Sequence, residues 1–390
     1  MKIGYVTVGG YPPDPEWGGI TTYLANIAPA IRKKGHSVTV VCAYKETPSV
    51  DFVDGVRVLR LINRNGRTQV NGQVAAILEN EIRDKTIDLV EFAEYGGHGA
   101  DFQKRNGNFP VTVRLHAPTE IVYYGSLPRW RRWVNYIYIP KRLREISRLE
   151  RYSVENAKSM TAPSEWIQRR LADLGWQLPV ARRTVANPFL RPETGRFQDV
   201  VLEEENTIVL LGRLCRLKGA DMYTDVIKNV MARVPSARFV IIGQDGQKSR
   251  QVSWWKHIET ALPRHVLSRV SYLGGIENAK LSKILRQFSI AAFMSVEENF
   301  PYTVLECMAE GLACVVGSGG GGQEMGVSGE SVVNVDRNSV SVSSAIVGLL
   351  ENNELRKAIQ AQAKLKAAEY SPEVVAVTME QVYLATIQRR

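Results

Sequence analysis

The sequence predicts an α/β protein with two domains, each built on a doubly wound parallel sheet. Three observations lead to this fold class. The chain of 390 residues is too long for one core of ordinary size. Short apolar runs of strand type alternate with stretches of helical spacing. The alternation stops in the polar run 191–206 and starts again at Ile208, which predicts a linker between domains 1–190 and 207–371.

The first domain opens with a strand, a glycine-rich loop, a helix and a second strand. The apolar run Ile3–Val8 is followed by helical spacing from Ile20 to Ile31, and Ser37–Cys42 is the next strand. This order is the βαβ unit of a parallel sheet. Gly18 and Gly19 open the helix, where absent side chains let a ligand approach the backbone. A tight loop would require the same two glycines, so both interpretations stay open.

The alternation continues with strands at Val56–Leu61, Asp88–Phe92 and Val111–His116, and with a helix at Val74–Lys85. His116 stands at the carboxyl end of its strand. Ligands of open α/β sheets collect beyond that edge. We therefore expect His116 to be a functional residue rather than a structural one.

The second domain begins with the strand Ile208–Gly212 and a basic turn. Arg213 and Lys218 lie five positions apart between this strand and the next helix, framed by Gly212 and Gly219. Two cations at such a turn can straddle a diphosphate and neutralise a leaving nucleotide. We expect this pair to bind phosphate.

A strand at Ile290–Met294 leads through a polar loop to a helix that starts near Pro301. Proline suits the first helical position because the missing N–H would have no partner there. The start of a helix also attracts phosphate and sugar oxygens. Glu298 and Glu306, with seven residues between them, flank this position, and a carboxylate can accept hydrogen bonds from two sugar hydroxyls.

The glycine pair, the basic turn and the E-x7-E pattern, in this order over nearly the whole chain, resemble family 4 retaining glycosyltransferases of the GT-B fold. The resemblance implies two Rossmann-like domains that face a cleft, with a last helix at about 374–390 that returns to the first domain. Glu298 would hold donor-sugar hydroxyls and Glu306 the nucleotide ribose. Gly18 and Gly19 would face the diphosphate, and His116 would contact the sugar. The resemblance implies a further set of donor-site residues: Gly212, Arg213, Lys218, Ile276, Asn299, Phe300, Pro301, Tyr302 and Thr303.

The same resemblance implies a hexosyltransferase that acts without a metal. No Asp-x-Asp occurs, so Arg213, Lys218 and the helix start would replace a cation. Glucose from UDP-glucose is the expected donor, and a glycan or lipid-linked acceptor would take it during polysaccharide or glycolipid synthesis. No cofactor is expected. Many family members have Asn-Gly where this chain has Asn187-Pro188, so no role is assigned to Asn187.

The positive charge of the chain is concentrated in its first half. Residues 1–190 hold 27 Lys+Arg against 18 Asp+Glu, and the net charge of the whole chain is +10. Aromatic and basic residues interleave at Arg129, Trp130, Arg131, Arg132 and Trp133. This pattern is typical of a protein surface that contacts lipid headgroups. We expect contact with an anionic membrane or the acceptor; a solvated helix packed on its aromatic side is the alternative. No nucleic-acid motif accompanies the stretch.

We expect a cytoplasmic protein, peripheral at the inner face of the plasma membrane. The first residues enter a strand directly, which leaves no room for a signal peptide. No apolar run reaches the roughly 18 to 20 residues needed to cross a bilayer. The four scattered cysteines show no metal-binding spacing, which predicts reduced and mostly buried thiols.

Three other functions remain open. A nucleotide-sugar epimerase shares the fold but needs carboxylates and histidines for elimination in the first domain, and a phosphorylase needs a longer chain with a pyridoxal-bearing lysine. A non-catalytic nucleotide-sugar sensor would keep every binding residue. Gly317, Gly319 and Gly322 fit the dinucleotide pattern G-x-G-x-x-G. We reject a dehydrogenase because the opening strand and helix of the sheet lack that motif.

Overall fold

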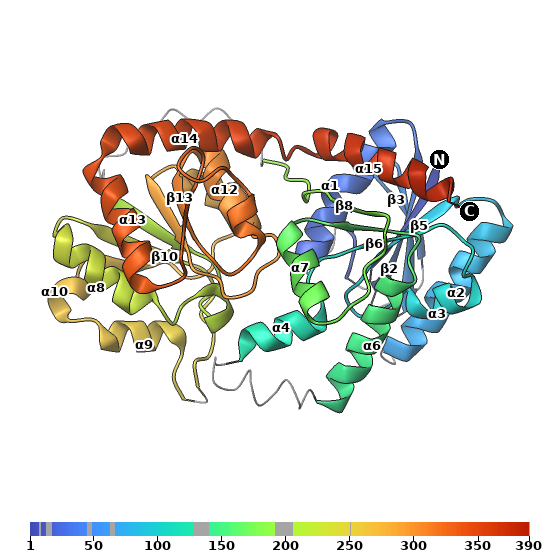
Figure 1. Cartoon of the computed structure of the whole chain (residues 1–390), viewed down its shortest axis with the longest axis horizontal. Coiled ribbons are helices and arrows are strands. Elements are labelled where there is room, and N and C mark those ends of the chain that lie inside the picture. Colours follow the sequence, from blue (N-terminus) through green and yellow to red (C-terminus); the bar gives the residue numbers. More distant parts are fainter. Residues whose placement is uncertain are drawn as a thin grey trace. The chain divides into compact units, whose positions relative to one another are not determined.

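A computed structural model describes residues 1–7, 9–12, 18–44, 49–62, 67–127, 140–191, 206–249 and 251–389 (Figure 1). The chain forms two compact units. Unit 1 comprises Met1–Leu190 and Tyr370–Arg390, and unit 2 comprises Arg191–Glu369.

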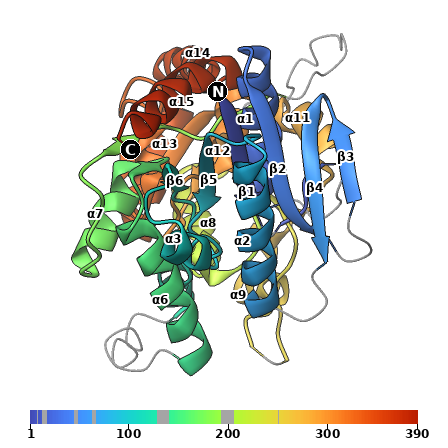
Figure 2. The same ribbon diagram turned by 90° about the vertical axis from the view of Figure 1, so that its right-hand side faces the viewer.

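Unit 1 contains an eight-stranded sheet in the order β3-β4-β2-β1-β5-β6-β7-β8. Its strands are β1 (Lys2–Thr7), β2 (Ser37–Tyr44), β3 (Ser49–Val53), β4 (Val56–Ile62), β5 (Leu89–Ala93), β6 (Val111–Arg114), β7 (Ser159–Ala162) and β8 (Arg182–Thr184). Every pair is parallel except β3–β4, which is antiparallel. Figure 2 shows β2, β4 and β3 side by side, with β3 at the outer edge.

Helices cover both faces of this sheet. They are α1 (Gly19–Lys33), α2 (Arg67–Arg83), α3 (Ala100–Arg105), α4 (Thr119–Ser126), α6 (Lys141–Glu155), α7 (Glu165–Asp173) and α15 (Pro372–Ile387). Side chains alternate between the faces along each strand. On β1, Tyr5 packs with α1 and α15, whereas Val6 packs with α2, α3, α4 and α7. Strands buried on both faces read as nearly continuous apolar runs, which is why the sequence predicts them.

Unit 2 contains a six-stranded sheet in the order β11-β10-β9-β12-β13-β14, with every pair parallel. Its strands are β9 (Thr207–Leu211), β10 (Arg238–Ile242), β11 (Val270–Tyr272), β12 (Ile290–Phe293), β13 (Ala313–Gly317) and β14 (Val333–Val335). Its helices are η1 (Arg216–Lys218), α8 (Tyr223–Arg233), α9 (Trp254–Ala261), α10 (Arg264–Leu267), α11 (Asn278–Leu285), α12 (Tyr302–Glu310), η2 (Gly321–Glu324), α13 (Ser339–Glu351) and α14 (Asn353–Ala368). One hydrophobic core joins this sheet to α8, α9, α13 and α14.

The predicted fold class of two doubly wound α/β sheets is confirmed, and three details differ. The antiparallel edge strand β3 was not expected. The short strand β8, which follows β7, was not expected either. β6 ends at Arg114, so His116 lies two residues beyond the strand. In the part of the chain that the structure describes, no helix is both long and apolar enough to cross a membrane.

Candidate active site

Three loops of unit 2 meet at the carboxyl ends of β9, β12 and β13. The Val296 N–H donates to the Leu217 carbonyl at 2.8 Å, which joins the loop after β12 to the loop after β9. The Glu298 N–H donates to the Gly319 carbonyl at 3.2 Å, and the Gly321 N–H donates to the Glu298 carbonyl at 2.9 Å. The main chain on both sides of Glu298 is therefore held by its neighbours.

Glycines make this close approach of the loops possible. Gly219 has a φ of +87°, and a Cβ there would lie 2.2 Å from the Met294 carbonyl oxygen. A Cβ on Gly320 would lie 2.0 Å from the Glu298 carbonyl oxygen. Gly319 and Gly320 thus serve the loop that carries Glu298, which accounts for the glycine run after β13 without a dinucleotide site.

The structure brings Lys218, Glu298 and Glu306 together. The Lys218 ammonium forms an ion pair with the Glu298 carboxylate, and the Ser295 hydroxyl donates to the other carboxylate oxygen at 2.6 Å. Burial raises the pKa of Glu306 to about 7, and the positive charge of Lys218 opposes that rise. One ammonium therefore acts on both carboxylates of the E-x7-E pattern.

The start of α12 lies between these two carboxylates. Pro301 is the residue that precedes the helix, with a φ of −77° and a ψ of 101°, and Tyr302 is the first helical residue. The expectation that Pro301 occupies the first helical position was therefore wrong by one residue, which is the usual uncertainty of a helix boundary. First-turn N–H groups, here including that of Thr303, have no partner inside a helix. The Phe300 ring packs edge-on against the Tyr302 ring at 5.6 Å, and Asn299 is buried.

The other predicted donor-site residues of unit 2 lie on loops at the same edge of the sheet. Gly212 follows β9 directly, and its φ of +138° turns the chain toward Arg213. Arg213 is exposed, and its guanidinium forms no ion pair with any residue that the structure describes. Ile276 is partly buried in the loop after β11. That loop is tied to β10 because the Gly243 N–H donates to the Gly274 carbonyl at 2.8 Å.

An ion-pair network that the sequence did not indicate supports the basic turn. Asp221 accepts a hydrogen bond from Arg216 at 3.3 Å and one from Arg337 at 3.0 Å. Arg337 also donates to the Met294 carbonyl at 2.7 Å. The network thereby ties the turn after β9 to the end of β12.

In unit 1, Gly18 and Gly19 lie at the start of α1. Gly18 caps the helix with extended backbone, and both residues are exposed. A Cβ at either position would have no atom within 4 Å. Packing among the described residues therefore does not require glycine here.

His116 is held at the carboxyl edge of unit 1. Its N–H donates to the Glu94 carboxyl at 2.7 Å, and its ring packs edge-on against the Tyr23 ring at 5.2 Å. Burial, together with the positive charge of Arg114, holds the pKa of His116 well below its usual value. The imidazole is consequently neutral near pH 7, which allows it to accept a hydrogen bond through one nitrogen.

Two buried carboxyl groups lie behind this histidine. Burial raises the pKa of Glu94 to about 8; the N–H of His116 opposes the rise and the Glu150 carboxylate adds to it. Glu150 accepts the Thr119 N–H at 2.9 Å and the Thr119 hydroxyl at 2.6 Å. The second oxygen of Glu94 has no hydrogen-bond partner among the described residues. Both acids position the loop after β6.

A buried arginine lies beneath the same loop. Arg114 is fully buried, and its guanidinium donates to the Val185 carbonyl at 2.7 Å and to the Asn187 side chain at 2.6 Å. The guanidinium also lies 4.8 Å from the centre of the Tyr23 ring. Asn187, to which the sequence assigned no role, is thus an anchor for Arg114.

Glu91 faces Arg114 inside the core. The Tyr23 and Tyr383 hydroxyls donate to its carboxylate at 2.9 and 2.8 Å. Burial raises the pKa of Glu91 to about 7, and the charge of Arg114 opposes the rise. Sequence reasoning missed Glu91, Glu94 and Arg114. The available signal was a charged residue inside or beside an apolar strand, because charges are rarely buried there without a purpose.

The predicted membrane or acceptor contacts, Arg129, Trp130, Arg131, Arg132 and Trp133, lie outside the described residues. Over the ranges that are described, no group of three or more His, Cys, Asp or Glu side chains could hold a metal ion.

Two family models match the chain. The model described as Glycosyltransferase Family 4 matches residues 17–188, and the model described as Glycosyl transferases group 1 matches residues 205–352. Among relatives, the Saccharomyces cerevisiae phosphatidylinositol N-acetylglucosaminyltransferase GPI3 subunit is 25% identical over 335 residues, which is 84% of this chain and 70% of that protein. A phosphatidylinositol N-acetylglucosaminyltransferase protein from Arabidopsis thaliana is 33% identical over 120 residues, which is 30% of this chain and 25% of that protein.

Solved structures resemble the whole chain at low sequence identity. Sucrose-phosphate synthase from Thermosynechococcus elongatus superposes with a TM-score of 0.76 at 17% identity. The superposition covers 100% of this chain and 99% of the synthase chain. Anabaena HepE in complex with UDP superposes with a TM-score of 0.71 at 16% identity. The superposition covers 99% of this chain and 100% of the HepE chain. At these identities the likeness shows the fold.

Proposed function

Because the chain belongs to family 4 of the glycosyltransferases and has the GT-B fold, we propose that it transfers a hexose from a UDP-sugar to a glycan or lipid-linked acceptor with retention of anomeric configuration. The observation that carries this proposal is the arrangement of Lys218, Glu298 and Glu306 around the start of α12. It combines a cation for phosphate with two carboxylates for hydroxyl groups.

In the proposed reaction, the acceptor hydroxyl attacks the anomeric carbon from the side of the departing diphosphate. The new C–O bond forms as the bond to the phosphate oxygen breaks, and that oxygen takes the acceptor proton. Lys218 and Arg213 stabilise the negative charge that develops on the leaving group, with the first-turn N–H groups of α12. Glu298 accepts hydrogen bonds from the donor-sugar hydroxyls, and Glu306 from the ribose. The neutral His116 accepts a hydrogen bond from a hydroxyl of the sugar. No metal and no protein nucleophile takes part.

The proposed donor is UDP-glucose. Support comes from HepE, a protein of the same fold that is described in complex with UDP-glucose. UDP-N-acetylglucosamine is the second candidate, since the yeast relative is by name an N-acetylglucosaminyltransferase. The two donors differ only at the sugar 2-position, so the pocket near Glu298 would decide between them.

A binding screen of nucleotide sugars tests base and sugar together. Glu306→Ala should weaken the binding of UDP itself, because a ribose contact is lost. Glu298→Ala should leave UDP affinity near wild type and weaken the binding of the UDP-sugar. Glu330→Ala, which removes an exposed carboxylate of the same unit, is the control. Equal UDP affinity in wild type and Glu306→Ala would contradict the ribose assignment.

Measurements of turnover separate the transferase from the epimerase and from the sensor. A transferase releases UDP only when an acceptor is present, whereas an epimerase converts the donor alone and a sensor converts nothing. UDP release measured with glycan and lipid acceptors, and without any, therefore distinguishes the three. Donor conversion without acceptor would favour the epimerase.

We also propose that the basic and aromatic segment at 129–133 contacts an anionic membrane or the acceptor, and that the protein acts in the cytoplasm at the membrane surface. Replacing Arg129, Arg131 and Arg132 by glutamine should lower binding to vesicles that contain anionic lipid. A control with Arg83, Arg169 and Arg264 replaced removes the same charge from exposed positions elsewhere. An equal loss in both variants would indicate a net-charge effect and contradict a specific contact.

A further inference from the structure

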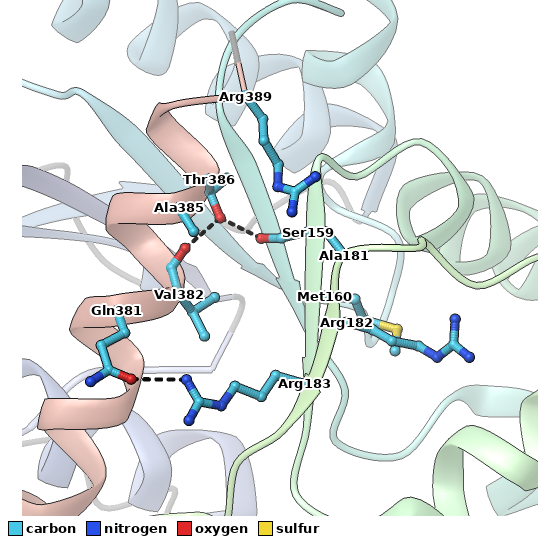
Figure 3. Close-up of a pocket in the computed structure, with 10 residues that line it drawn as sticks. All are labelled: Ser159, Met160, Ala181, Arg182, Arg183, Gln381, Val382, Ala385, Thr386 and Arg389. Carbon is cyan, nitrogen blue, oxygen red and sulfur yellow. Dashed lines mark hydrogen bonds between the residues drawn. The ribbon is translucent and has the colours of Figure 1, made fainter.

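Unit 1 contains a pocket that the proposed reaction does not use. It has a volume of about 210 Å³ and lies between α15 and the paired strands β7 and β8 (Figure 3). Its polar lining residues are Ser159, Arg182, Arg183, Gln381, Thr386 and Arg389.

The pocket lies at the opposite edge of the sheet from His116. Ser159 is the first residue of β7 and Arg182 the first residue of β8, so the pocket is at the amino ends of these strands. His116 follows the carboxyl end of β6. Since substrates of open α/β sheets bind beyond the carboxyl ends, this pocket is separate from the candidate active site.

Two guanidinium groups reach into the pocket without an acidic partner. Figure 3 shows Arg183 extending toward α15 and Arg389 extending from the end of α15 into the space beside β7. Arg183 is oriented by a hydrogen bond to the Gln381 side chain at 3.0 Å. No lining residue is acidic, and neither guanidinium forms an ion pair within the described ranges. Arg182, by contrast, points away from α15 and donates to the Pro179 carbonyl at 3.2 Å.

The polar side chains at the floor of the pocket are uncharged, and their hydroxyl groups already have hydrogen-bond partners. The Ser159 and Thr386 hydroxyls are 2.6 Å apart, and Thr386 donates to the Val382 carbonyl at 2.7 Å. The Thr112 hydroxyl lies 2.8 Å from that of Ser159. These buried hydroxyls neutralise no charge, so the positive potential of the two arginines is left for a ligand. Both arginines are exposed, so a ligand can reach them from solvent.

We propose that this pocket binds a phosphate monoester, with Arg183 on β8 and Arg389 at the end of α15 contacting the phosphate from two sides. Guanidinium groups bind phosphate through paired hydrogen bonds. The volume is below that of pockets for drug-sized ligands, which fits a phosphate with a small group attached. The phosphate can come from a small metabolite or from a phosphatidic acid headgroup. A bound phosphate would fasten α15 to β8.

Calorimetric titration with glycerol phosphate, in the presence of saturating UDP, tests the proposal. UDP occupies the donor site, so the remaining binding reports the second pocket. Arg183→Gln and Arg389→Gln should each weaken it by about tenfold or more, in line with a lost charged hydrogen bond. Arg182→Gln is the matched control, since it removes a neighbouring charge that points away, and it should change binding by less than about twofold.

A second measurement uses vesicles of phosphatidylcholine with and without phosphatidic acid. Vesicle binding that requires phosphatidic acid and is lost in Arg183→Gln, together with no binding of glycerol phosphate, assigns the site to the headgroup. Binding of glycerol phosphate that is lost in Arg183→Gln, together with no binding to the vesicles, assigns the site to a free metabolite. An equal loss in Arg182→Gln and Arg183→Gln overturns the proposal, as does the absence of binding in both experiments. If UDP does not bind, a loss of glycerol phosphate binding in Arg183→Gln and Arg389→Gln but not in Arg182→Gln still assigns the binding to this pocket, so the proposed donor site can fail without affecting this result.

Discussion

Lys218 has two effects at the proposed donor site: it forms an ion pair with Glu298 and opposes the raised pKa of Glu306. We predict that Lys218→Ala lowers turnover by about 10²-fold or more, because a positive charge that stabilises the leaving diphosphate is removed. Lys218→Arg should restore part of the loss. Steady-state rates of UDP release measure both, and Lys256→Ala on α9 is the control. A turnover rate of Lys218→Ala equal to that of the wild type would contradict the proposed role of Lys218 in stabilising the leaving diphosphate.

Glu94 makes the stability of unit 1 depend on pH. Its pKa rises from 4.5 to about 8 on folding, so the folded chain holds an extra proton between these values. Stability therefore falls as pH rises from about 5 to 8, by up to about 1.4 kcal/mol per pH unit from this group. Within unit 1, Glu91 acts in the same direction, and His116 acts oppositely below its ordinary pKa.

We therefore predict that Glu94→Gln flattens this slope without abolishing it. Urea midpoints measured between pH 5 and 8.5 give the comparison, and Glu145→Gln at an exposed position of α6 should keep the wild-type slope. A Glu94→Gln slope equal to that of wild type would mean that the carboxyl ionises alike in the folded and unfolded chain.

The residues of the proposed donor site were assigned from local spacing in the sequence, and their role in donor binding stays a prediction. Glu298 and Glu306 are eight positions apart on one loop and helix, and Lys218 follows a recognisable strand. Glu94 and Arg114 could not be predicted, since their partners are distant in sequence: Arg114 contacts Val185 and Asn187, and the Glu94 carboxyl faces His116 and Glu150. No single-sequence pattern specifies such pairs.

Among the elements, the loop after β13 packs closely against the loop that carries Glu298. We predict that Gly320→Ala weakens UDP-sugar binding by about tenfold or more, because the added Cβ would lie 2.0 Å from the Glu298 carbonyl oxygen and the loop must move. Gly348→Ala is the matched control. It lies within α13 with no atom within 4 Å of its Cβ, and should stabilise the protein by about 0.5–1 kcal/mol. Titration with the donor measures both, and unchanged affinity in Gly320→Ala would show that this loop tolerates displacement.

Elements with strong periodicity were predicted well, and short edge elements were not. The last helix, expected at about 374–390, is observed at Pro372–Ile387, where the Ser371 side chain caps it by accepting the Val374 N–H. β3 exposes Val50 and Phe52, and β8 is exposed throughout. Such strands are stabilised by hydrogen bonds to one neighbour, so their sequence carries little of the apolar signal.

At the scale of the whole molecule, each of the three described hydrophobic clusters belongs to one unit. Two lie in unit 1 and one in unit 2. The last helix α15 contributes Val375, Ala376, Met379 and Tyr383 to a core of unit 1, although it follows unit 2 in sequence. The core of unit 1 is therefore complete only after unit 2 has been synthesised.

Separate cores predict separate unfolding. Scanning calorimetry should resolve two transitions, and UDP at 100 times its dissociation constant should stabilise the unit that contains Glu306 by about 2.7 kcal/mol. The other transition should shift much less, because the ligand then acts on it only indirectly. Deleting 372–390 should lower the transition of unit 1 and leave that of unit 2 unchanged, which also identifies the two peaks. A single transition that UDP shifts as a whole would contradict this prediction, since the units would then unfold as one cooperative body.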